Sequence, residues 1–220
     1  MKKQFFIANW KSHKTPKETT EWFENFARHM GRKEENDTIL VCPPFPLLSL
    51  CRELAHKHTP YVSIGAQDIS YFPEGAYTGE VSGRLIGSLA THVIIGHSER
   101  RSYFDEREKV LSEKVLMAQA NMLTPIFCIS SKNDSVPKRV KIVAYEPIEA
   151  IGTGDPASPE TVEQIAHGLK EKNDADYILY GGSVDAKNVA SYTSLPSING
   201  VLVGTASLDP QEFAHLIQHA

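Results

Sequence analysis

Long hydrophobic runs and an excess of positive charge are both missing from this sequence. The apolar stretch after Met1–Gln4 is far shorter than the roughly 20 residues of a membrane-spanning helix, and it is also too short for the core of a signal peptide. Asp and Glu outnumber Lys and Arg by 27 to 23, which gives no basic surface for nucleic acid. We therefore expect a cytoplasmic protein that binds neither membranes nor nucleic acid.

Cysteine is scarce as well. The three cysteines, Cys42, Cys51 and Cys128, form no C-x-x-C pair, which favours reduced thiols over disulfides. His56 and His58 are the only closely spaced histidines, and a helix would point them to different faces with no third ligand nearby. No metal site is expected.

What the sequence does have is a regular alternation of short β-type runs and helical patterns. Some helical patterns carry start signals, such as Ser158-Pro159-Glu160. We predict strands at 5–9, 38–42, 61–66, 92–96, 123–129, 141–146, 176–181 and 199–204. We predict helices at 16–30, 46–57, 84–90, 105–121, 159–171, 185–193 and 208–218.

Strands that alternate with helices imply a parallel sheet joined by crossovers. An open doubly wound sheet would place its ligand at one switch point. Here the unusual residues instead follow the ends of several strands. This pattern favours an α/β fold of the (β/α)8 barrel type, with its site at the carboxyl ends of the strands. We expect residues 1–220 to form one barrel domain.

One repeat unit is incomplete. The stretch S-S-K-N-D-S-V-P-K-R, residues 130–139, shows no helical apolar repeat. We therefore predict that the helix between strands 5 and 6 is shortened or missing. That loss leaves apolar surface to be covered either by residues 130–140 themselves or by another subunit.

Polar and charged residues stand at the ends of the predicted strands 1, 4 and 6. Asn9 and Lys11, in A-N-W-K, fall on one face if the strand alternation continues past the strand end. His97 follows strand 4 in I-I-G-H-S-E-R-R, and Glu146 ends strand 6 ahead of a proline and a glycine-containing stretch. Taken alone, each could be an ordinary surface or structural residue.

Two familiar motifs are only partly matched. G-H-S-E-R is similar to the G-x-S-x-G elbow of serine hydrolases, but Arg100 stands where the turn needs glycine. G-T-G-D-P-A, residues 152–157, is similar to a dinucleotide fingerprint. However, it does not directly follow its strand, and Asp176 begins the next strand instead of ending it. Both signals are weak.

Glycine-containing turns end strands 7 and 8, in Y-G-G-S (180–183) and V-G-T (203–205). On neighbouring strands, such turns would expose several backbone N–H groups together, and these groups bind phosphate. A carboxylate base, a neutral polarising group, a lysine and an anion cradle around one mouth suit proton abstraction beside a carbonyl in a small phosphorylated substrate. This chemistry needs neither a metal nor a cofactor.

These motifs resemble one family, triosephosphate isomerase, over essentially the whole chain. The match runs in order through A-N-W-K, G-A-Y-T-G-E-V-S (75–82), I-I-G-H-S-E-R-R-S-Y-F (94–104), A-Y-E-P-x-x-A-I-G-T-G (144–154), Y-G-G-S-V (180–184) and V-G-T-A-S-L (203–208). The resemblance implies an aldose–ketose isomerase of glycolysis and gluconeogenesis. Such an enzyme interconverts dihydroxyacetone phosphate and glyceraldehyde 3-phosphate through an enediol or enediolate, with no cofactor.

The resemblance also implies roles for residues of this chain. Glu146 corresponds to the base, and neutral His97 to the group that polarises the carbonyl. Lys11 corresponds to the source of positive charge, with Asn9 as its polar partner. Ser98 and Glu99 are implied to orient these groups. The implied phosphate-binding N–H groups belong to Gly152, Ser183, Gly204 and Thr205. The implied lid consists of Pro147, Ile148, Glu149, Ala150, Ile151, Gly152, Thr153 and Gly154.

The segment G-A-Y-T-G-E, residues 75–80, resembles the loop by which members of this family interdigitate. Thr78 is implied to reach the partner subunit's Asn9 and the partner's Lys11, so we expect a homodimer. A tetramer is possible if another subunit covers the place of the missing helix.

The sequence departs from the family pattern beside the lid. Glu149 stands where the family usually has tryptophan, and Cys128-Ile129-Ser130-Ser131 stands where it usually has C-I-G-E. We therefore expect the open lid to be anchored differently, by Glu149 with Lys132 or Arg139.

Two rival interpretations stay open. Another phosphate-binding barrel isomerase, acting on a larger substrate, should lack the lid motif that this chain has. A non-catalytic barrel should have lost Lys11, His97 or Glu146, and all three are present.

Overall fold

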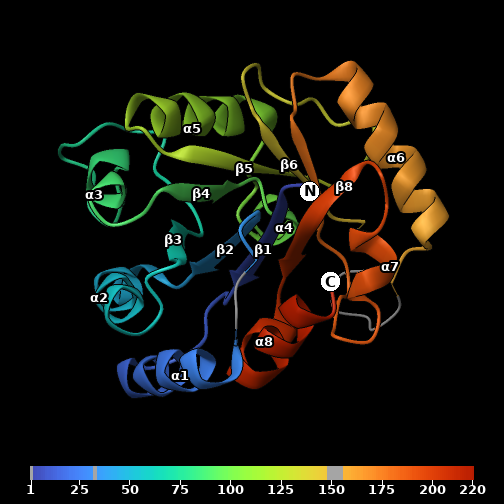
Figure 1. Ribbon diagram of the computed structural model, residues 1–220. Coiled ribbons are helices and arrows are strands. Elements are labelled where there is room, and N and C mark those ends of the chain that lie inside the picture. Colours follow the sequence, from blue (N-terminus) through green and yellow to red (C-terminus); the bar gives the residue numbers. More distant parts are fainter. Residues whose placement is uncertain (1, 32–33, 148–155) are drawn as a thin grey trace.

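The described part of the chain folds into a closed barrel of parallel strands surrounded by helices (Figure 1). The structure is a computed structural model and describes residues 2–31, 34–147 and 156–220. Each strand pairs with the next strand along the chain, and β8 returns to pair with β1. The predicted (β/α)8 architecture is confirmed.

The strands lie within one or two residues of their predicted positions. They are β1 (Gln4–Asn9), β2 (Asp37–Cys42), β3 (Val62–Ala66), β4 (His92–Ile95), β5 (Thr124–Ile129), β6 (Ile142–Tyr145), β7 (Tyr177–Tyr180) and β8 (Ile198–Val203). The helices are α1 (Pro16–His29), α2 (Leu48–His58), α3 (Gly83–Gly87), α4 (Ser98–Tyr103), α5 (Glu108–Ala120), α6 (Pro159–Lys172), α7 (Val189–Thr193) and α8 (Pro210–Gln218). Two short 3-10 helices are η1 (Phe45–Leu47) and η3 (Thr205–Ser207). None of these described helices has the length and apolar character needed to cross a bilayer.

Side chains of the strands alternate between two apolar layers. One layer fills the barrel and consists of strand residues such as Ile7, Leu40 and Ile94. The other layer packs between strands and helices, where Trp22 and Phe26 of α1 stack with ring centroids 4.8 Å apart. Because both faces of the sheet are buried, the strands read as almost continuous apolar runs. Polar side chains can therefore reach a cavity or solvent only at the strand ends.

Several helices begin at residues whose side chains accept hydrogen bonds from the first helical turn. Thr15 and Glu18 form a reciprocal capping box at the start of α1. Ser158 caps α6 ahead of Pro159, as the start signal in the sequence predicts, and Asp209 caps α8. These caps define where each crossover turns back along the barrel.

Between β5 and β6 the chain runs without a helix, as predicted, and this interval lies wholly within the described residues. The backbone N–H groups of Ser130 and Ser131 both donate to Oδ2 of Asp134, at 2.8 and 3.2 Å. Val136 then packs partly against the core, and Val140 is buried. The segment therefore folds back and covers part of the gap itself.

The helix α4, directly after β4, was not predicted from the sequence. Its six residues, S-E-R-R-S-Y, lack an apolar repeat. The helix is held in place through Arg100, which contacts Glu106 at 2.6 Å and Asp68 at 3.0 Å. Buried Lys114 of α5 bridges the same two carboxylates at 2.5 and 2.6 Å. These ion pairs hold α4 in place through its third residue, Arg100.

Candidate active site

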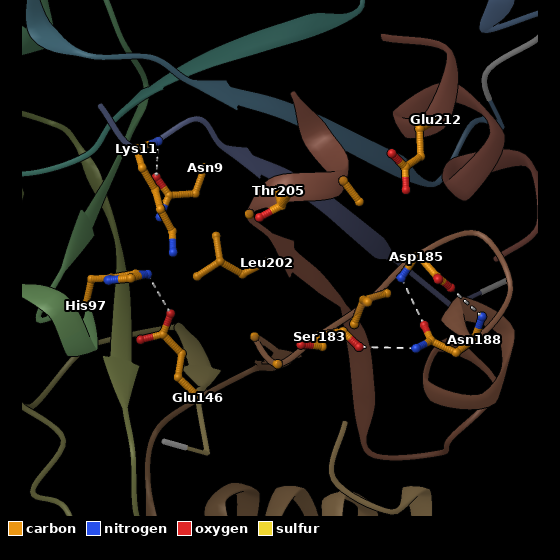
Figure 2. Close-up of a pocket in the computed structure, with 15 residues that line it drawn as sticks. Asn9, Lys11, His97, Glu146, Ser183, Asp185, Asn188, Leu202, Thr205 and Glu212 are labelled. Carbon is orange, nitrogen blue, oxygen red and sulfur yellow. Dashed lines mark hydrogen bonds and ion pairs between the residues drawn. The ribbon is translucent and has the colours of Figure 1, made fainter. Parts of the chain in front are cut away.

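A cavity of about 350 Å³ opens at the carboxyl ends of the strands (Figure 2). Its lining comes from the ends of β1, β4, β6, β7 and β8, which are far apart in the sequence and meet only because the barrel closes. The predicted residues that line it are Asn9, Lys11, His97, Glu146, Ser183, Gly204 and Thr205.

Glu146 is a buried carboxylate at the inner wall of this cavity. Its Oε1 lies 3.1 Å from Nε2 of His97, and its Oε2 accepts the backbone N–H of Ser98 at 3.1 Å. Burial raises the pKa of Glu146, while His97, the Ser98 N–H and Lys11 act in the opposite direction. Since the net shift is upward, the carboxylate is a stronger base than an exposed glutamate.

His97 has a defined tautomer. Its Nδ1 accepts the backbone N–H of Glu99 at 3.2 Å, at the first turn of α4. The ring proton of the neutral imidazole therefore lies on Nε2, which points toward Glu146 and the cavity (Figure 2). Such a ring can donate a hydrogen bond to a substrate oxygen. The backbone N–H groups of Ser98 and Glu99, in the first turn of α4, thus contact Glu146 and His97 respectively.

The Lys11 side chain reaches the cavity because the chain turns after β1, and not because the strand alternation continues past Asn9 as predicted. β1 ends at Asn9, and Lys11 has a left-handed backbone with φ 52°. Its N–H donates to Oδ1 of Asn9 at 3.2 Å, which stabilises this turn. Its Nζ lies 2.7 Å from Oε1 of Glu99, so the ammonium is directed toward the space beside His97. A strained backbone of this kind is common at functional sites.

The glycine turns after β7 and β8 complete the lining, and the first of them begins beside Glu146, since a Cβ at Gly181 would lie 2.8 Å from Cγ of Glu146. Gly182 has no room for a side chain, because a Cβ there would lie 2.1 Å from the hydroxyl oxygen of Tyr180. Ser183 is tied down through its carbonyl, which accepts from Nδ2 of Asn188 at 3.1 Å. Gly204 lies beside the Lys11 side chain, since a Cβ at Gly204 would lie 3.5 Å from Cε of Lys11. The two turns therefore face the cavity with their backbone.

Sequence comparison gives this arrangement its family. A profile described as triosephosphate isomerase matches residues 4–220. The chain belongs to the triosephosphate isomerase family. It is 38% identical to the triosephosphate isomerase of Mesomycoplasma hyopneumoniae strain 7448, over 98% of both chains. The corresponding enzymes of Solibacter usitatus and Thermus thermophilus are 37% and 35% identical over 99% and 100% of both chains.

Several features of this triosephosphate isomerase family site were not predicted. Cys128, in the layer of β5 residues that fills the barrel, lies near the Glu146 carboxylate. Burial and, after it, the charge of Glu146 raise the pKa of Cys128, so this thiol stays protonated. The alternation of β5 was the only signal for this inward direction. All three cysteines, the others being Cys42 and Cys51, are free and buried, as expected of reduced thiols.

The outer end of the cavity carries acidic groups that were also not predicted. Asp185 and Glu212 both line it, together with Asn188 (Figure 2). Burial and the nearby Asp209 and Asp185 raise the pKa of Glu212. These carboxylates disfavour an anion in the part of the cavity beside Asp185 and Glu212.

Some predictions concern residues that the structure does not describe. Pro147 is buried directly after Glu146, whereas the rest of the lid expected in this triosephosphate isomerase family member, residues 148–154, lies outside the described part. The phosphate-binding role of Gly152 and the anchoring role of Glu149 lie outside it too. Among the residues that are described, no three His, Cys, Asp or Glu side chains are grouped to hold a metal ion.

Proposed function

We propose that this cavity is the site at which the chain interconverts dihydroxyacetone phosphate and glyceraldehyde 3-phosphate, with Glu146 as the base. The isomerase activity itself follows from membership of the family. One observation supports the role of Glu146 above the others. Its carboxylate is buried, with a raised pKa, beside a histidine whose ring proton faces the cavity.

Each step can be assigned to groups of this chain. Glu146 removes a proton from C1 of dihydroxyacetone phosphate, and the C–H electron pair forms the C1=C2 bond. The C2 carbonyl electrons move to O2, which accepts a hydrogen bond from Nε2 of His97 and is close to the charge of Lys11. Glu146 returns the proton to C2, and the O1 hydroxyl proton passes to O2. An aldehyde remains at C1, so all atoms balance.

We assign the phosphate to the part of the lining formed by Ser183, Gly204 and Thr205. Gly204 has no side chain that could cover its N–H group, and backbone N–H groups at such turns bind phosphate. Acidic Asp185 and Glu212 disfavour a second anionic group at the outer end. The proposed substrates are small water-soluble phosphates, which agrees with the cytoplasmic location and the glycolytic and gluconeogenic role expected from the sequence.

The proton-transfer mechanism is tested by turnover in heavy water. We expect the protein to convert glyceraldehyde 3-phosphate to dihydroxyacetone phosphate rapidly, with deuterium appearing at C1 of the product. Deuterium enters because the proton held by Glu146 exchanges with solvent before it is returned. Proton NMR of the product measures the label directly.

Two other results would contradict the proposal. A fast reaction with fully protiated product would indicate direct hydrogen transfer between the carbons. No turnover by the folded wild-type protein would indicate a barrel that has kept the residues but not the reaction.

We also propose that the active protein is a homodimer in which residues 75–80 of one subunit enter the other. A second cavity, of about 340 Å³, borders Asn9 and Lys11 on the side away from the glycine turns, and Phe104, which lines it, is 64% exposed. Residues 73–80 are exposed, and Phe72 stacks on Tyr77 with ring centroids 4.2 Å apart. The loop carries stacked aromatic rings, and the second cavity is lined by Phe45 and Phe104. This supports apolar contact between the loop of one subunit and the cavity of the other.

The change Thr78→Arg is expected to convert this dimer to monomers and to lower kcat by about 100-fold. A long charged side chain at the loop tip would not fit the aromatic cavity, and loss of the partner's loop would leave Lys11 less well positioned. Light scattering after size exclusion gives the mass, and the isomerase assay gives kcat.

The control is Thr20→Arg on the solvent side of α1, which adds the same charge far from both cavities. It is expected to retain the mass and kcat of the wild type. A monomeric wild type with full activity would contradict the dimer proposal and leave the catalytic assignment intact.

A further inference from the structure

Two buried tyrosines hold both polar backbone groups of Ala157. The Ala157 N–H donates to the hydroxyl oxygen of Tyr180 at 2.9 Å, and its carbonyl accepts from the Tyr192 hydroxyl at 2.7 Å. Ala157 lies just after the undescribed residues 148–155 and directly before Ser158, the cap of α6. The chain is therefore fixed at this point in both directions.

The Ala157 backbone therefore links the two hydroxyls. Tyr192 donates to its carbonyl, and its N–H donates to Tyr180. Burial raises the pKa of both phenols, which keeps both hydroxyl protons in place. Two hydrogen bonds on the backbone of one residue polarise each other and so strengthen each other.

Tyr180 is packed directly against a turn of the active site. Tyr180 is the last residue of β7, and its own ring lies so close to Gly182 that a Cβ there would be 2.4 Å from Cζ. The Tyr192 ring stacks on the Tyr180 ring, with centroids 4.3 Å apart and planes 22° from parallel. The position of the Tyr180 ring thus limits where Gly182 can lie.

The same short stretch of chain also fixes the far end of the turn. Asn188 immediately precedes α7, which carries Tyr192, and its Nδ2 donates to the Ser183 carbonyl. The turn 181–183 is consequently held at Tyr180 by one residue of this stretch and at Ser183 by another. Helix α7, which lies outside the cavity lining, supports the wall that faces the substrate.

We propose that Tyr192 is a positioning residue for phosphate binding, and that its hydroxyl fixes Ala157, which in turn holds Tyr180 and the turn 181–183 in the conformation that presents backbone N–H groups to the phosphate. This inference rests on the proposed function, since it assigns the phosphate to that turn. A phenylalanine at position 192 would keep the stacked ring and lose the donor to the Ala157 carbonyl. The hydroxyl can therefore be tested separately from the packing.

The experiment compares wild type, Tyr192→Phe and Tyr61→Phe. For Tyr192→Phe we expect the KM for glyceraldehyde 3-phosphate and the inhibition constant of inorganic phosphate to rise together by about tenfold, with kcat changed less than about threefold. Both constants rise because the turn contacts phosphate equally in the ground state and the transition state. Tyr61, a partly buried tyrosine beside β3 and away from the cavity, is the matched control and should leave all three values unchanged.

A Tyr192→Phe protein with a lower melting temperature but wild-type KM and phosphate inhibition would overturn the inference, because the tyrosine would then be structural only. If that variant does not fold, Tyr180→Phe removes the acceptor for the Ala157 N–H, at the other end of the same pair of hydrogen bonds, and must show the same parallel rise; unchanged constants there also overturn the inference. Calorimetric titration with inorganic phosphate separates the two proposals. An inactive wild type that binds phosphate refutes the proposed function, while the shift in its dissociation constant on Tyr192→Phe still decides the role of Tyr192.

Discussion

Glu146→Gln is expected to lower kcat for isomerisation by about 10³- to 10⁴-fold, with KM changed less than about threefold. An amide cannot accept the carbon-bound proton, whereas the proposed phosphate site at Ser183, Gly204 and Thr205 does not involve this carboxylate. Glu146→Asp keeps the carboxylate but withdraws it by one methylene. Since a misplacement of about 1 Å costs about 100-fold in rate, this variant is expected to lose most of kcat as well. Steady-state kinetics in both directions measures both effects.

The control for this prediction is Glu53→Gln, which removes an exposed carboxylate on α2. It is expected to behave as wild type. If Glu146→Asp kept near-normal turnover, the position of the carboxylate would not limit the reaction. If Glu146→Gln did so, another group would have to be the base.

The variant Glu146→Gln also shows how the buried carboxylate affects the pH dependence of stability. The pKa of Glu146 is raised in the folded protein, so between the unfolded pKa and the folded pKa the native state binds more protons than the unfolded state. The wild type therefore loses stability as pH rises through that window, and Glu146→Gln does not. Urea unfolding at several pH values should show that the stability of the variant relative to wild type increases with pH. A difference that falls with pH would mean that the folded protein favours the charged carboxylate.

Gly200→Ala is expected to destabilise the barrel by about 4 kcal/mol or more. Gly200 pairs with Phe5 where β8 meets β1, and it has φ 133°. A Cβ at this position would lie 2.0 Å from the Phe5 carbonyl oxygen and 2.6 Å from the Phe5 nitrogen. Both contacts are with backbone, so neither can be relieved by a side-chain rotation. Urea unfolding followed by circular dichroism measures the loss, and a refolded variant with wild-type stability would show that the barrel closes in another register.

Gly168→Ala serves as the matched control for this change. Gly168 lies within α6, and a Cβ there would meet no heavy atom within 4 Å. The substitution is expected to stabilise the protein by about 0.5–1 kcal/mol, because alanine favours the helix over glycine. Opposite signs for the two glycines would locate the strain at the closing pair of strands.

The barrel could be predicted from sequence because each buried strand is a short apolar run and most crossovers carry a helical pattern. The crossover from β5 to β6, which has no helix, also lacks that pattern in the sequence. The site could be predicted because Lys11, His97 and Glu146 follow strand ends, which a closed parallel barrel brings to one mouth. Local sequence did not predict α4. That helix depends on a side-chain cap from His97 and on ion pairs between Arg100 and distant carboxylates.

The support provided by Tyr192 could not be predicted for a similar reason. In the sequence, Tyr192 is one more large apolar position of a short helix. Its hydroxyl acquires a role only because the fold brings it to a carbonyl 35 positions earlier in the chain. Hydrogen-bond partners at such separations leave no local pattern. Cys128 is similar, since strand alternation indicates that it points inward but not that it meets Glu146.

The pairing of β1 with β8 also affects how the barrel closes during synthesis of the chain. The strand β1 can pair with its second neighbour only after the chain has been extended as far as β8, Ile198–Val203. At a synthesis rate of about 5–20 residues per second, roughly 10–40 s pass between the synthesis of Phe5 and that of Gly200. During that interval the nascent sheet has two open edges, whose unpaired backbone groups invite pairing with other chains. Ribosome-bound chains of this protein should therefore be most dependent on chaperones just before β8 emerges, and largely independent of them once it has paired.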